Sequence, residues 1–136
     1  MGNGQRCNKP LRGGVILTYK MKKTETEHIL RIICKDYPRR KRLLESTRNQ
    51  GTSTEILQAC YVLNQAVDEA MAETYAQTQA FAPNFGEVML TDIAECRGFA
   101  FSPLSAVMCE GSYKKYKRQV KEGIARRLCL PVYPSR

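Results

Sequence analysis

The sequence has no tryptophan, a single histidine (His28) and no apolar run long enough to cross a bilayer. Its longest apolar runs, such as Val15-Ile16-Leu17, fall far short of the roughly 20 residues that a transmembrane helix needs. None of the six cysteines belongs to a C-x-x-C pair, and only His28 could join them as an imidazole ligand, so no metal site is predicted. We expect a cytoplasmic protein without membrane, metal or other cofactor, whose reduced cysteines pack as small apolar side chains.

Catalytic residue types are equally sparse. His28 has no serine or cysteine nucleophile in a recognisable motif beside it. The carboxylates follow helical patterns without the spacing of metal ligands, which argues against a nuclease. We therefore predict that the protein is not an enzyme.

Positive charge is missing from the middle of the chain. All 22 lysines and arginines lie before Asn49 or from Arg97 onward. The segments 1–48, 49–96 and 97–136 carry net charges of +9, −7 and +7. Two basic zones flanking an acidic one point to a nucleic acid bound by the ends of the chain, with the middle free to pack or to meet a protein.

The chain of 136 residues fits one domain, and its apolar periodicity is helical almost throughout. We predict an all-α fold, a small helical bundle with a C-terminal helix-turn-helix-like unit. Residues 1–20 are expected to form a flexible basic leader and 21–82 the N-terminal helices, including a long acidic one. Residues 83–130 would form the helix-turn-helix-like DNA-binding region, and 131–136 a tail.

Two capping signals predict where the two N-terminal helices begin. Thr24 and Glu27 form a capping box that predicts a helix to about residue 35. Asp36 and Pro38 are expected to open a second helix over residues 39–49, which ends before Gly51. Four consecutive helical positions there are basic and span about 300° of arc, so they cannot all face one phosphate strand. They are candidate phosphate contacts: Arg39, Arg40, Lys41 and Arg42.

The longest predicted helix covers residues 54–78, after the capping box Thr52-Ser53-Thr54-Glu55. Its apolar residues recur at spacings of four and three, which is a short heptad-like seam. A core helix of a small bundle is the favoured interpretation, and a homodimer through the seam is the alternative. The pattern breaks at Pro83, where we place a linker. The seam consists of Ile56, Cys60, Leu63, Val67 and Ala70.

The C-terminal third contains the most informative helix. A short helix over residues 87–97 should end at Gly98, followed by a turn at Ser102-Pro103 and a brief helix to residue 109. Ser112 is then expected to cap a helix over residues 113–128. Its apolar stripe is Tyr113, Tyr116, Val120, Ile124 and Leu128, and its opposing basic arc is Lys114, Lys115, Arg118 and Lys121.

This helix has the properties of a recognition helix: a serine cap, basic first turns for the major groove and an apolar stripe toward a scaffold. The other interpretation is an amphipathic surface helix with solvated lysines. Seven basic residues against one acidic residue over 113–128 exceed what solubility requires, which favours DNA.

Two segments resemble the late-gene transcriptional regulators of phages and prophages, of the ArpU/RinA type. One runs from Lys35 through Tyr37-Pro38 to Arg42, and the other from Ser112 to Val120 with the Ile124-Ala125-Arg126-Arg127-Leu128 end. One departure concerns spacing, because Ile93-Ala94 stands about twice as far before Ser112 as in a compact helix-turn-helix. Ser102 has the expected spacing, but residues 102–109 contain no lysine or arginine, so we keep Ser112 and expect an extended connection.

The resemblance implies a sequence-specific DNA-binding regulator that activates late phage genes in the cytoplasm of a bacterial host, with RNA polymerase as a further partner. Base and phosphate contacts would come from Ser112, Lys114, Lys115, Lys117, Arg118 and Lys121, and further backbone contacts from Arg126 and Arg127. An RNA- or polymerase-directed antiterminator is one alternative, although few aromatic residues are available for base stacking. A helical protein-interaction module that binds no nucleic acid is the other.

Overall fold

The computed structural model describes residues 22–46 and 51–131. Within these ranges the chain forms helices and no strand, which confirms the predicted all-α class. The predicted basic leader and all of the predicted tail except Pro131 lie outside the described residues. The elements are α1 (Lys23–Lys35), α2 (Tyr37–Glu45), α3 (Thr54–Thr78), α4 (Phe85–Ala94), the 3-10 helices η1 (Phe99–Phe101) and η2 (Pro103–Ala106), and α5 (Glu110–Arg127).

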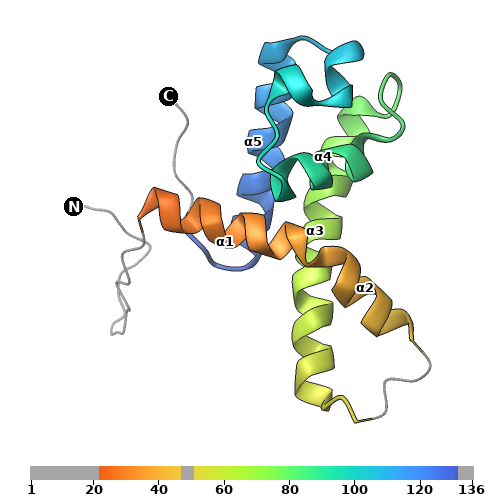
Figure 1. The fold of residues 1–136 in the computed structure, drawn as a ribbon, viewed down its shortest axis with the longest axis vertical. Helices are drawn as coiled ribbons and strands as arrows, with labels where there is room; N and C mark the ends of the chain where they lie inside the picture. Colours follow the sequence, from red (N-terminus) through yellow and green to blue (C-terminus); the bar gives the residue numbers. More distant parts are fainter. Residues whose placement is uncertain (1–21, 47–50, 132–136) are drawn as a thin grey trace.

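The long helix α3 extends along most of the length of the molecule (Figure 1). Helix α5 packs along its C-terminal half, and α2 packs beside its N-terminal half. Helix α1 runs across the middle of the molecule, where it contacts α4, α5 and α2. The 3-10 helices lie at the end of the molecule where α5 begins. Lys23, the first residue of α1, and Pro131, the last residue that the structure describes, line one hollow beside α5.

The core forms where α1, α3, α4 and α5 meet. The apolar stripe predicted for the C-terminal helix is confirmed, because Tyr113, Val120 and Ile124 are buried and Tyr116 and Leu128 pack against the core. Burial of apolar surface is the main favourable term in the stability of such a bundle. The other large buried residues are Leu30, Ile33, Val67, Phe85, Met89, Ile93 and Leu104.

Helices α3 and α5 approach closely at Gly123. A Cβ atom at this position would lie 3.0 Å from the Cβ of Ala70 and 3.3 Å from the Nη1 of Arg127. Ala70 and Gly123 are both buried, so the two helix backbones meet with almost no side chain between them. Two small residues thus permit the main helix contact of the fold.

This packing revises the predicted dimer seam. Val67 and Ala70 are each 1% exposed within the chain's own core, so a second copy could not reach them. Only the N-terminal end of the seam stays open, where Ile56 is 53% exposed. The interpretation of α3 as a core helix therefore holds for its C-terminal half, because α5 covers that face.

Four predicted helix starts need correction, and one of them is that of α4, which begins at Phe85 rather than at Glu87. Helix α1 begins at Lys23 rather than after Thr24, because the Glu25 carboxylate accepts a hydrogen bond from the Lys22 amide at 2.8 Å. Helix α2 covers Tyr37–Glu45 rather than residues 39–49. Helix α5 begins at Glu110, and Ser112 lies inside its first turn rather than at the N-cap, which is Cys109. Glu110 favours this earlier start, because an acid suits the positive end of the helix dipole.

Helix α3 has the predicted bounds, Thr54–Thr78. Its N-cap is Ser53, whose hydroxyl accepts a hydrogen bond from the Ile56 amide at 3.2 Å. The predicted break at Pro83 also holds, since that residue lies between α3 and α4.

The predicted end of α4 at Gly98 is wrong. The left-handed residue after this helix is Cys96, with φ 55°, and Gly98 has φ −85°. The amide of Arg97 reaches back to the carbonyl of Asp92 at 2.7 Å, which is the long hydrogen bond of a Schellman motif. Helix α5 ends in the same way, with Cys129 at φ 58°. Cysteine at these positions carries the steric cost that glycine would avoid.

Candidate nucleic-acid interface

The eight residues predicted to contact DNA all lie on α5, but they do not share one free face. Lys114, Lys115 and Arg126 are exposed, and Arg118 is partly exposed. The Lys114 ammonium lies 3.1 Å from the Glu110 carboxylate, in an exposed ion pair of the i, i+4 type that is worth little in water. These cations remain accessible to a polyanion.

Lys117 points toward the end of α4. Its ammonium donates a hydrogen bond to the carbonyl of Arg97 at 2.7 Å and lies 5.4 Å from the centre of the Tyr113 ring. Burial lowers the pKa of Lys117, and the neighbouring charge of Lys121 lowers it further. Lys117 thus supports the turn after α4 and adds positive potential near the surface.

Lys121 joins α5 to α1. Its Nζ lies 2.5 Å from Oε1 of Glu27, in an ion pair between helices that are far apart in the sequence. Ser112 is half-buried in the first turn of α5, where its hydroxyl accepts a hydrogen bond from the thiol of Cys109 at 3.4 Å. Neither residue has the position expected for the tip of a recognition helix.

Arg127, predicted to contact a nucleic-acid backbone, pairs with two carboxylates of α3. Its guanidinium donates to Glu73 at 2.5 Å and to Glu69 at 3.1 Å, and also to the carbonyl of Gly123 at 3.1 Å. The hydrogen bond with Glu73 is the main reason that the pKa of Arg127 is raised. These contacts fasten the end of α5 to α3, directly beside the close approach at Gly123.

A groove of about 280 Å³ runs between α1 and α5. Cationic side chains from both helices line it, together with two carboxylates and an apolar floor. The cations are Lys23, Lys114, Lys117, Arg118 and Lys121, the carboxylates Glu27 and Glu122, and the remaining lining residues Thr26, Leu30, Ala125 and Pro131.

A second hollow of about 360 Å³ lies on the other side of Glu27, Lys117 and Lys121, next to the turn after α4. Arg31 and His28 of α1 contribute to it. The two hollows share three lining residues, so the basic surface continues from α5 across α1. We call this surface, lined by α1 and α5, the basic groove face.

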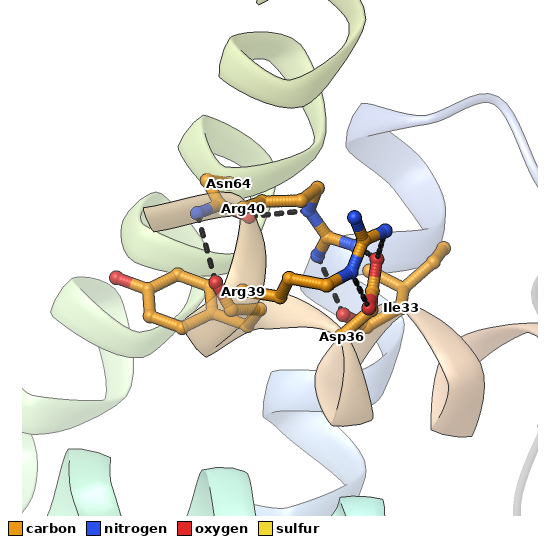
Figure 2. Close-up of polar contacts among 6 residues, drawn as sticks. Ile33, Asp36, Arg39, Arg40 and Asn64 are labelled. Carbon is orange, nitrogen blue, oxygen red and sulfur yellow. Dashed lines mark hydrogen bonds and ion pairs between the residues drawn. The ribbon is translucent and has the colours of Figure 1, made fainter. Parts of the chain in front are cut away.

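The four candidate phosphate contacts of α2 are placed very differently, and Figure 2 shows two of them, Arg39 and Arg40. Arg40 is only 4% exposed and cannot reach a phosphate at the surface. Its guanidinium donates to Oδ1 of Asn64 at 2.6 Å and to the carbonyl of Ile33 at 2.5 Å. The pattern of four consecutive cations did not show this, because the burial of Arg40 results from the packing of α1 and α3 around α2.

Arg39 is exposed but pairs with the carboxylate of Asp36 through two hydrogen bonds of 2.7 and 2.6 Å. The hydrogen bond from Arg39 is the main cause of the lowered pKa of Asp36. Lys41 and Arg42 are exposed on α2 and line neither hollow of the basic groove face.

A buried polar cluster holds the connection between α4 and α5. Asp92 is fully buried and accepts hydrogen bonds from the hydroxyls of Ser102 at 2.5 Å and Tyr113 at 2.9 Å. Burial and the hydrogen bond to Asp92 raise the pKa of Tyr113. The guanidinium of Arg97 lies 3.3 Å from the other Asp92 oxygen, at an angle outside hydrogen-bond geometry.

This cluster bears on the register of the predicted helix-turn-helix-like unit. Ser102, the alternative capping serine, is buried and caps η2 through its hydroxyl, which accepts from the Leu104 amide at 3.1 Å. Residues 95–109 with their two 3-10 helices separate α4 from α5, whereas a compact helix-turn-helix has a turn of about three to four residues. The connection is therefore extended, as the spacing predicted.

No group of three or more histidine, cysteine, aspartate or glutamate side chains in the described part of the chain could hold a metal ion. None of the helices in residues 22–46 and 51–131 has both the length and the apolar composition that crossing a membrane requires. Comparison of the chain with protein-family models, with curated proteins and with solved structures finds no match.

The sequence reasoning missed the contribution of α1 to this surface. Lys23, Thr26 and Glu27 lie beside α5, although about 90 residues separate them from their neighbours on that helix. Lys23 and Glu27 are spaced four residues apart, which places them on one face of a helix. That spacing could indicate a shared face, but only the packing of α1 across α5 identifies its partner.

Proposed function

We propose that the protein binds double-stranded DNA through the basic groove face and the exposed cations of α5 beside it, and acts as a transcription regulator. The observation that carries this proposal is the separation of charge in space. Cations of α1 and α5 gather around the groove, whereas the acids of the central segment lie on α3 and α4. Such a field attracts a polyanion to one side of the molecule and keeps it from the other.

The exposed cations of α5 are the expected contact residues. Lys114, Lys115 and Arg118 lie in its first half, where the free amides of the helix start add partial positive charge. Arg118 can pair with a guanine edge in the major groove, since its planar guanidinium fits a bidentate contact. Lys117 and Lys121 strengthen the field while holding α5 against the turn after α4 and against α1.

Duplex DNA is favoured over single-stranded RNA by the placement of the two tyrosines of α5, although Phe101 of η1 is 81% exposed. Tyr113 is buried, and Tyr116 packs against Phe85 with ring centres 6.1 Å apart. Neither ring is free to stack on an unpaired base, which single-strand recognition usually requires. By its resemblance to late-gene regulators, we expect the target to be promoter DNA of a phage or prophage. The exposed acidic side of α3 would then be available to RNA polymerase.

The test is fluorescence anisotropy with a labelled duplex over a series of salt concentrations. Replacing Lys115 and Arg118 together by glutamate should abolish binding, because two phosphate or base contacts become repulsive. A neutral substitution that removes one phosphate-binding cation should lower the salt slope by about one. Circular dichroism should show unchanged helix content, since both side chains are at least partly exposed.

The matched control is Lys41→Glu with Arg42→Glu on α2, which makes the same change in charge on another surface. We expect this variant to keep most of the affinity. Equally weakened binding in both double variants would mean that net charge alone drives binding and would refute the assigned surface. Unlabelled structured RNA that competes better than duplex DNA would favour the antiterminator alternative.

A further inference from the structure

The groove between α1 and α5 carries more positive charge than its own carboxylates balance. Five cations line it against Glu27 and Glu122, which leaves an excess of three positive charges. Glu122 lies 3.9 Å from Arg118, at the outer limit of an ion pair. The groove therefore attracts an anion, whatever the rest of the surface does.

The floor of the groove is apolar. Leu30 and Ala125 are almost fully buried, and Pro131 lines the groove beside them. Low-polarity walls strengthen the attraction between an anion and the cations above them, because water screens these charges less there. A charged group bound in this groove would be held more firmly than one on an open helix surface.

Thr26 supplies an unpaired hydrogen-bonding group in the same groove. The residue lines the groove and is only 3% exposed. Its hydroxyl oxygen has no hydrogen-bond partner among the residues that the structure describes. A buried hydroxyl without a partner is costly and rare in folded proteins, so this one calls for an explanation.

Glu27 indicates which chemistry suits the groove. Its carboxylate lies 2.5 Å from the Lys121 ammonium, so one cation of the groove is already paired with a carboxylate of the chain itself. A phosphate presents the same kind of oxygen with more charge and additional acceptors. It could bind Lys121 in competition with Glu27 and also accept a hydrogen bond from Thr26.

We propose that the groove between α1 and α5 binds one phosphate group, with Lys121 and Thr26 as ligands. The group can come from the DNA backbone or from a small phosphorylated molecule, and the first source rests on the proposed function. This assignment gives the Thr26 hydroxyl its missing partner. It also makes α1 a part of the binding site rather than only a support for α5.

The first arm of the experiment measures the thermal midpoint of the full chain in sodium phosphate and in sodium chloride at matched ionic strength. Phosphate stabilises most proteins by exclusion from their surface, and this general effect is equal in wild type and variants. The comparison is made with Thr26→Val, Thr26→Ser and Lys121→Gln. Lys41→Gln serves as the matched control for Lys121→Gln, because it removes the same charge from an exposed residue of α2 outside the groove.

We expect wild type, Thr26→Ser and Lys41→Gln to gain more from phosphate than Thr26→Val and Lys121→Gln do. Thr26→Val should have a higher thermal midpoint than wild type in chloride, because the substitution removes an unsatisfied hydroxyl. The same variant should bind phosphate about tenfold more weakly, because it loses one hydrogen bond to a charged group. A threonine with only a structural role would not separate stability from phosphate response. An equal phosphate response in all five chains would overturn the proposal.

The second arm repeats the duplex titration with Thr26→Val. A weaker affinity for DNA together with the reduced phosphate response identifies a backbone phosphate as the ligand. Unchanged DNA binding with the reduced phosphate response identifies a small phosphorylated ligand instead. If wild type binds DNA without any specific phosphate response, the groove site fails while the proposed function stands. If it responds to phosphate and does not bind duplex, the proposed function fails while the site stands.

Discussion

Replacing Arg40 by methionine should lower the free energy of unfolding by about 3 kcal/mol, because this arginine joins three helices from a buried position. Its Nε and Nη2 donate to Asn64 of α3 and to the Ile33 carbonyl near the end of α1. Each acceptor left without a donor costs about 1 to 3 kcal/mol. Methionine fills most of the volume and avoids burying a charge, which offsets part of that penalty.

Two features of the cluster limit the size of the effect. The contact from Arg40 to Asp36 is long, at 3.4 Å, and Asp36 retains the shorter ion pair with Arg39. The destabilisation should therefore fall near the lower end of the range of about 3 to 5 kcal/mol known for broken buried pairs. Burial is the main cause of the lowered pKa of Arg40, and the nearby Asp36 carboxylate acts in the opposite direction.

Urea denaturation followed by circular dichroism at 222 nm measures this change, and Arg42→Met is the matched control. Arg42 is exposed on the same helix, so its replacement should alter stability by less than about 0.5 kcal/mol. In the DNA titration, at a temperature where both variants are folded, Arg40→Met should leave the salt slope unchanged. Equal destabilisation of the two variants, or a lower salt slope for Arg40→Met, would refute the interpretation that buried Arg40 holds α1, α2 and α3 together.

Three further predictions concern helix packing and cysteine. Gly123→Ala should destabilise the protein by about 1 kcal/mol, since about 2 kcal/mol of overpacking against Ala70 exceeds the gain in helix propensity. In an Ala70→Gly background the same change should stabilise the protein. Additive effects of the two substitutions in a double-mutant cycle would contradict this. Cys96→Gly and Cys129→Gly should each raise the free energy of unfolding by about 0.5 to 1 kcal/mol, whereas alanine at either position should give no gain in urea denaturation. Burial raises the pKa of Cys34 to about 12. Iodoacetamide at pH 8 should therefore alkylate Cys34 about a thousandfold more slowly than the exposed Cys129. Equal alkylation rates of the two cysteines in the native protein, measured by mass spectrometry, would count against the burial of Cys34.

Local sequence determined the helices themselves. The all-α class and the bounds of α3 follow from the periodicity of apolar residues and from the signals near Thr54 and Pro83, which act over a few residues. The buried stripe of α5 follows for the same reason, because residues spaced three and four apart share one face of a helix. Helix starts were less predictable, as at Ser112, because several nearby residues compete to cap the same turn.

Tertiary structure decided what each charged side chain does. Arg40 and Arg42 are equivalent in the sequence pattern, yet one is buried against Asn64 and the other is exposed. Likewise Arg127 binds two acids of α3, while the adjacent Arg126 remains exposed. Composition reports how many cations the chain has, but which of them can meet a phosphate depends on the partners that distant helices bring to them. The groove between α1 and α5 exists only because two helices far apart in the sequence bury their apolar faces in one core.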